Sequence, residues 1–143
     1  MTPEQARDLR ALAGTMVPAS ARHGVPGADD EAIFADIARS LGRDRAEVEK
    51  ALERLALLGG GRFADLPGGR RLDVANAFRA EGGPLLAAVV RAVLLCYYRD
   101  DRVMTALGQE PRPPFPKGHV VEQGDWSLLD PVKQRAPFYR RPT

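Results

Sequence analysis

Proline is distributed unevenly along the 143-residue chain, and residues 109–143 hold seven of its twelve prolines. Because proline has no backbone N–H and restricts the residue before it, this density makes regular structure nearly impossible in the segment. Aromatic and aliphatic side chains are nevertheless interspersed there, which is uncommon in simple linkers. We therefore predict two parts: a helical domain over residues 1–108, and an extended arm over residues 109–143 that wraps the body or a partner subunit.

Before residue 109, apolar residues recur at helical spacing between glycine and proline breaks. The pattern predicts a first helix starting at Pro3, a fourth over residues 67–81, a fifth over residues 84–98 and a short sixth before Gly108. No period-two alternation is long enough for a strand. The predicted fold class is all-α: a small bundle of five to six helices with a long irregular Pro-rich C-terminal arm.

Two capping boxes are expected at helix starts. Thr2, Pro3 and Gln5 match the cap, the first-turn proline and the reciprocal acceptor of a first helix. Asp44 and Glu47 repeat that spacing at the start of the third helix.

The fourth and fifth helices differ in how much apolar surface they carry. In the fourth, Leu72, Ala75 and Phe78 are expected to face inward, with Val74 as a further candidate. The fifth is apolar nearly all round, which is typical of a helix at the centre of its domain. We therefore expect the fifth helix to be the central one.

Charge gives little support for nucleic-acid binding, because 21 Lys and Arg against 19 Asp and Glu leave a net charge of only +2. A winged-helix DNA reader would need residues 60–72 as its wing. Its third helix would then present Glu47, Glu49 and Glu53 to the phosphates. Our main expectation is no nucleic acid; a free-standing helical interaction protein or DNA-binding regulator stays open as the alternative.

Few residues offer catalytic or metal chemistry. Cys96 lies in the apolar fifth helix with no histidine close in sequence, which favours a buried packing residue over a nucleophile. His119, Glu122 and Asp125 have ligand-type side chains but no helix to align them, and His23 is isolated. No strand-bound GxGxxG motif is present. We expect no catalytic residue, no cofactor and no metal in this chain.

Targeting and membrane signals are weak. The N-terminus has neither the apolar core of a signal peptide nor a twin-arginine signal. The longest apolar run, residues 84–98, contains Arg91 and is too short to span a bilayer. These features favour a cytoplasmic protein with no membrane span.

The features left over point to a protein interface. The end of the fifth helix combines aromatic and charged residues of the kind that anchor interfaces, and the arm supplies further apolar anchors. Each buried anchor of the arm would contribute ~1.5–3 kcal/mol of transfer free energy. The predicted interface residues are Tyr97, Tyr98, Arg99, Arg102, Phe115, Trp126, Leu128, Phe138 and Tyr139.

The order of several short motifs resembles the gluconate 2-dehydrogenase subunit 3 family. Residues 9–18 (LRALAGTMVP) and 24–27 (GVPG) are similar to its opening helix and the loop that follows. Residues 60–67 (GGRFADLP) resemble its F-x-x-L-(S/P) connection. Residues 97–103 (YYRDDRV) resemble its Y-Y-x-D-P-R-V element, with Asp101 in place of the proline. The likeness covers about residues 5–126.

The resemblance implies a non-catalytic small subunit paired with a large FAD-dependent dehydrogenase of the glucose–methanol–choline type, with FAD in that partner. Such complexes oxidise sugars, sugar acids or alcohols and commonly pass electrons to a cytochrome c, a second implied partner. The small subunit would help to fold, stabilise or export the flavoprotein. A periplasmic location follows from the resemblance, whereas the missing twin-arginine signal favours the cytoplasm, so the compartment stays unknown.

Overall fold

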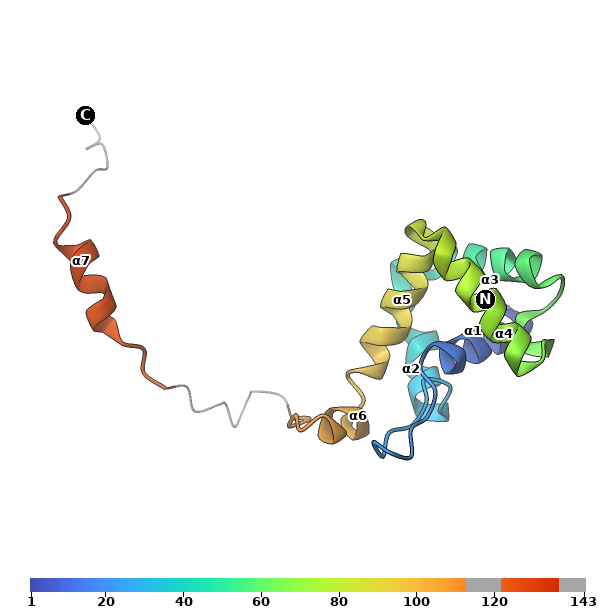
Figure 1. Ribbon diagram of the computed structural model, residues 1–143, viewed down its shortest axis with the longest axis horizontal. Coiled ribbons are helices and arrows are strands. Elements are labelled where there is room, and N and C mark those ends of the chain that lie inside the picture. Colours follow the sequence, from blue (N-terminus) through green and yellow to red (C-terminus); the bar gives the residue numbers. More distant parts are fainter. Residues whose placement is uncertain (113–121, 137–143) are drawn as a thin grey trace. The chain divides into compact units, whose positions relative to one another are not determined.

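The computed structural model describes residues 1–112 and 122–136, which belong to two separate units (Figure 1). The first unit, Met1–Pro111, is called the body here, and the second is Arg112–Thr143. The body contains α1 (Pro3–Met16), α2 (Glu31–Ser40), η1 (Gly42–Asp44), α3 (Arg45–Gly59), η2 (Phe63–Asp65), α4 (Gly68–Glu81), α5 (Gly83–Tyr97) and α6 (Asp101–Ala106). Apart from one isolated bridge between Ser20 and Val25, the described residues contain no β-structure. The all-α fold class is confirmed.

The start of α1 follows the predicted capping box. The Thr2 hydroxyl accepts from the Gln5 backbone N–H at 3.1 Å, and the Gln5 side chain accepts from the Thr2 N–H at 2.8 Å. One turn later, the buried Asp8 carboxylate accepts from the Ala64 N–H at 2.8 Å. This long-range bond fixes η2 against α1 and places Phe63 in the core, fully buried.

The expected capping box of α3 is wrong. Asp44 makes no side-chain capping bond, and its backbone is helical because η1 runs directly into α3. A capping residue normally has extended backbone. The Asp44 carboxylate instead accepts two bonds from Arg91 of α5, at 2.8 and 2.7 Å. At its other end α3 closes as expected, with Gly60 in the left-handed conformation (φ +72°) that glycine adopts without strain.

Helix α4 begins one residue later than expected, with Pro67 as its cap, and its inward face differs from the prediction. Val74 and Phe78 are buried, whereas Leu72 is 52% exposed. Val74 follows Leu72 by two positions, which is about 200° around the axis, so the two cannot share a face. The winged-helix wing is also wrong, because η2 and the first turns of α4 occupy residues 60–72.

Helix α5 contributes to the core but is not the central helix that the sequence predicted, because α3 contacts α1, α4 and α5 while one face of α5 stays exposed. It packs beside α2 and α3, as the yellow helix of Figure 1 shows, while α4 packs on α1 and α3. Its inner face buries Val89, Val93 and Cys96, among other residues. These side chains join one continuous core cluster, whose buried members all lie between Leu9 and Val103.

The second unit is less irregular than predicted. A 3₁₀ turn, η3 (Trp126–Leu129), leads into a short helix, α7 (Asp130–Lys133). Pro131 lies in the first turn of α7, where its missing N–H costs no helical hydrogen bond. The proline argument therefore fails for residues 126–133, which are called the Trp126 segment below.

Candidate protein-protein interface

The predicted interface residues of the body surround the turn between α5 and α6. Asp100 begins α6, because its carboxylate accepts from the Arg102 backbone N–H at 3.0 Å. Asp101 is the first residue of that helix. Both proline and an acidic residue suit this position, since proline has no N–H to leave unpaired there and a carboxylate interacts favourably with the helix dipole.

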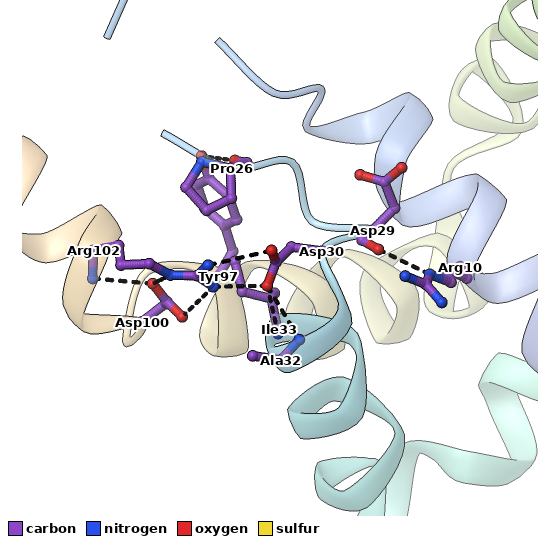
Figure 2. A network of polar contacts seen from close by, with 9 residues as sticks. All are labelled: Arg10, Pro26, Asp29, Asp30, Ala32, Ile33, Tyr97, Asp100 and Arg102. Carbon is purple, nitrogen blue, oxygen red and sulfur yellow. Dashed lines mark hydrogen bonds and ion pairs between the residues drawn. The ribbon is translucent and has the colours of Figure 1, made fainter. Parts of the chain in front are cut away.

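Arg102 joins the starts of two helices (Figure 2). Its guanidinium donates to Asp30 Oδ1 at 2.7 Å and to Asp100 Oδ1 at 3.0 Å. Asp30 caps α2 and Asp100 caps α6. The hydrogen bonds from Arg102 hold the pKa of both carboxyls below the ordinary value. Arg102 therefore satisfies its charge within the body and ties α6 to α2.

Tyr97 is a core residue. Its side chain is buried (4% exposed), and its hydroxyl donates to the carbonyl oxygen of Pro26 at 3.1 Å (Figure 2). Burial raises the pKa of this hydroxyl. The contact fixes the 17–28 loop on α5, so Tyr97 supports the neighbouring surface instead of forming it.

Arg99 is exposed, but its guanidinium is paired with groups of the body. Its guanidinium donates to Asp36 Oδ2 at 2.7 Å and to Ser40 Oγ at 2.5 Å, both on α2. The Cys96 Sγ lies 3.5 Å from the same guanidinium. Cys96 is buried as predicted, and desolvation raises the pKa of its thiol, so the sulfur packs chiefly as an apolar atom.

Tyr98 is exposed, unlike its neighbour. Its ring is 53% accessible and meets the Tyr97 ring edge-on, with centroids 5.2 Å apart. Two further apolar residues near the α5–α6 turn are exposed and were missed by the sequence analysis: Leu95 at 62% and Leu107 at 57%. The signal was the fifth helix itself, since a helix that is apolar all round but has only one buried face must expose the remainder.

In the second unit, the Trp126 segment presents apolar side chains, and all of residues 122–136 are exposed. Trp126 is 62% and Leu128 74% exposed, and Leu129 and Val132 are exposed as well. Asp125 caps the segment by accepting from the Ser127 N–H at 3.0 Å. The three other predicted anchors, Phe115, Phe138 and Tyr139, lie outside the described residues.

The described residues contain neither a cluster of three metal-ligating side chains nor a membrane-spanning helix. Within residues 1–112 and 122–136, no group of three or more His, Cys, Asp or Glu side chains could hold a metal ion. His119 of the candidate ligand set lies outside those ranges, and Asp125 serves as a cap. Among the described helices, none has the length and apolar character needed to cross a bilayer.

Comparison with protein-family models, curated proteins and solved structures finds no match to this chain. The resemblance to the gluconate 2-dehydrogenase subunit 3 family therefore rests on the sequence motifs alone. The geometry adds two exposed apolar surfaces, one at the end of α5 and one on the Trp126 segment.

Proposed function

We propose that the chain is a non-catalytic accessory subunit of an FAD-dependent dehydrogenase complex that oxidises sugars, sugar acids or alcohols. Its role is to help fold and stabilise the large flavoprotein subunit, which holds the FAD. The identity of the partner is supported by the short motifs that resemble the gluconate 2-dehydrogenase subunit 3 family and occur in the same order. The exposed apolar residues at the end of α5 and on the Trp126 segment support the role, because exposed apolar patches are typical of contact sites.

The observation that carries the proposal is the Trp126 segment. Trp126 and Leu129 are three residues apart in the 3₁₀ turn, a spacing that places their side chains on one side, and Val132 is exposed on the following α7. The Asp125 cap already orders the turn, so less conformational entropy is lost when a partner covers it. Exposing this much apolar surface is unfavourable for a monomer and is typical of a contact site.

Stabilisation of the partner follows from mass action. A subunit that binds only the folded flavoprotein shifts its folding equilibrium by RT ln(1 + [L]/Kd), which is about 2.7 kcal/mol at a hundredfold excess over Kd. This chain would act through bound surface area, with no reacting group of its own. A cytochrome c that accepts electrons from the flavin is the second proposed partner.

The test is purification of the chain with a tag from the cells that encode it. We expect a large flavoprotein to co-purify in a defined ratio, identified by mass spectrometry and by the absorption of bound FAD. A haem spectrum in the same fraction would add the cytochrome, and cell fractionation would decide between periplasm and cytoplasm. The proposal is wrong if the chain is recovered only as a monomer, or if the isolated chain itself binds flavin.

A further inference from the structure

The outer face of α5 is an apolar stripe that no other helix of the body covers. Val90, Leu94 and Tyr98 recur every fourth residue and so lie along one side of the helix, with Leu95 beside them. Val90 and Leu94 are half-buried, whereas Leu95 and Tyr98 are exposed. These four residues are called the α5 stripe.

Three hollows meet along the α5 stripe. One, of about 420 Å³, lies over all four stripe residues. A second, of about 310 Å³, continues from Val90 and Leu94 to Leu72 of α4. A third, of about 340 Å³, extends from Tyr98 to Leu107 beyond α6. The exposed positions of Leu72 and Leu107 thus belong to one elongated apolar surface.

The charged side chains that line these three hollows are arginines. Arg91 and Arg99 line the first hollow and Arg79 the second, and no Asp or Glu lines any of the three. Arg91 and Arg99 are already paired, with Asp44 and Asp36. Arg79, at the end of α4, is exposed and has no carboxylate partner among the described residues.

We propose that the α5 stripe binds a helix of the large flavoprotein subunit, which presents an apolar face and a carboxylate that pairs with Arg79. The inference rests on the proposed function and deepens it by naming the docking surface and the chemistry it selects. Val90 to Tyr98 spans about 12 Å of helix, enough for two turns of an incoming helix laid along it.

The unpaired guanidinium of Arg79 favours an acidic partner helix over a second copy of this chain as the molecule bound at the α5 stripe. A second copy of this chain docked stripe to stripe would bring the same arginines and no carboxylate, so it would leave Arg79 unpaired. A partner helix with an acidic residue satisfies that guanidinium. Covering Arg91 and Arg99 strands no charge, because Asp44 and Asp36 already neutralise them, and a buried unpaired charge is what makes such covering costly.

The experiment compares two exposed leucines in the full, tagged chain expressed in its own cells. Leu95→Asp places a carboxylate in the stripe, whereas Leu57→Asp places one at a leucine of α3 that is 73% exposed and lines none of the three hollows. We expect the co-purifying FAD-containing dehydrogenase to fall at least tenfold with L95D and to stay at the wild-type level with L57D.

A second pair tests the acidic chemistry. Arg79 and Arg70 lie on the same helix, two and a half turns apart and therefore on opposite sides. Arg79→Glu should weaken the complex at least tenfold, with the loss reduced at high salt, and Arg70→Glu should leave it unchanged. Circular dichroism confirms that each variant is folded; should L95D fail to fold, Tyr98→Glu replaces it.

The outcomes separate the two proposals. If wild type retains the flavoprotein and L95D retains it equally, the α5 stripe is not the docking surface, although the accessory role stands. If wild type retains no flavoprotein, the accessory role fails and the inference fails with it. A wild-type dimer that L95D abolishes, with flavoprotein binding unchanged, would make a second copy the occupant and overturn the inference.

Discussion

The body and the Trp126 segment begin their helical turns with the same kind of aspartate cap, but they differ in how much apolar surface they bury. In both, an aspartate accepts a backbone N–H at a helix start: Asp100 at α6 and Asp125 at η3. In the body these turns rest on a core in which Phe63 is fully buried, whereas Leu128 of the segment is 74% exposed. Local signals form a turn, but only long-range packing buries its apolar residues, so the segment keeps its apolar surface available to a partner.

The largest effect separates the two regions by their aromatic residues. Phe63→Ala should lower the free energy of unfolding by about 3–5 kcal/mol, because it removes a fully buried ring from the core. Trp126→Ala should change it by less than about 0.5 kcal/mol, because the ring is 62% exposed. Urea unfolding measures both. Equal losses would show that the segment belongs to the same folded core.

The same comparison can be made with one aspartate from each region, Asp8 in the body and Asp125 beside the Trp126 segment. Asp8→Ala should lower the free energy of unfolding by about 1–3 kcal/mol, since it leaves the Ala64 N–H without its buried acceptor. Asp125→Ala removes a similar bond to the Ser127 N–H, but outside the core, and should leave the unfolding free energy unchanged. Chemical denaturation of both variants tests this, and a neutral Asp8→Ala would contradict the role given to the buried carboxylate.

The Arg102 contacts predict a pH dependence confined to the body. Because the folded-state pKa of Asp30 and Asp100 lies below the ordinary value, their contribution to stability is complete above about pH 4. It is lost as the pH falls through the lower folded values. Thermal unfolding between pH 5 and 2 should therefore show a steeper loss for wild type than for Arg102→Ala. Lys133→Ala, which breaks the exposed pair with Asp130, should follow wild type.

The smallest effect is the removal of the whole second unit. A chain that ends at Pro111 keeps every buried member of the core cluster. Its free energy of unfolding should lie within about 0.5 kcal/mol of the full chain. A larger drop in urea unfolding would mean that the body depends on residues 112–143 for its stability.

Features set by neighbouring residues could be predicted from the sequence. The Thr2–Gln5 capping box spans three residues, and the six helices of the body follow apolar stripes between glycines and prolines. The prediction that Asp44 caps α3 was wrong because its carboxylate binds Arg91, which is far along the chain. The prediction that Leu72 faces inward was wrong because packing against α1 and α3 decides which side of α4 is buried.

The candidate interface was harder to predict for the same reason. Tyr97 and Tyr98 are adjacent and have the same side chain. Tyr97 is buried and its hydroxyl donates to the Pro26 carbonyl oxygen, whereas Tyr98 is exposed. Arg99 and Arg102 were expected at a contact surface, and the structure pairs them with Asp36 and Asp30 from distant α2 and its cap. Leu95 lies three residues before Tyr98 and so on the same side of the helix, but only the three-dimensional fold shows that this side is left uncovered in the body.

The most direct test of the accessory role is the FAD content of the complex purified with the full chain and with the chain that ends at Pro111. The account predicts a folded truncated body that recovers at least about tenfold less FAD-containing dehydrogenase. Losing even one buried apolar anchor is worth ~1.5–3 kcal/mol, and about 1.4 kcal/mol is a tenfold change in affinity. Equal FAD per chain in the two preparations would contradict the claim that the Trp126 segment holds the partner.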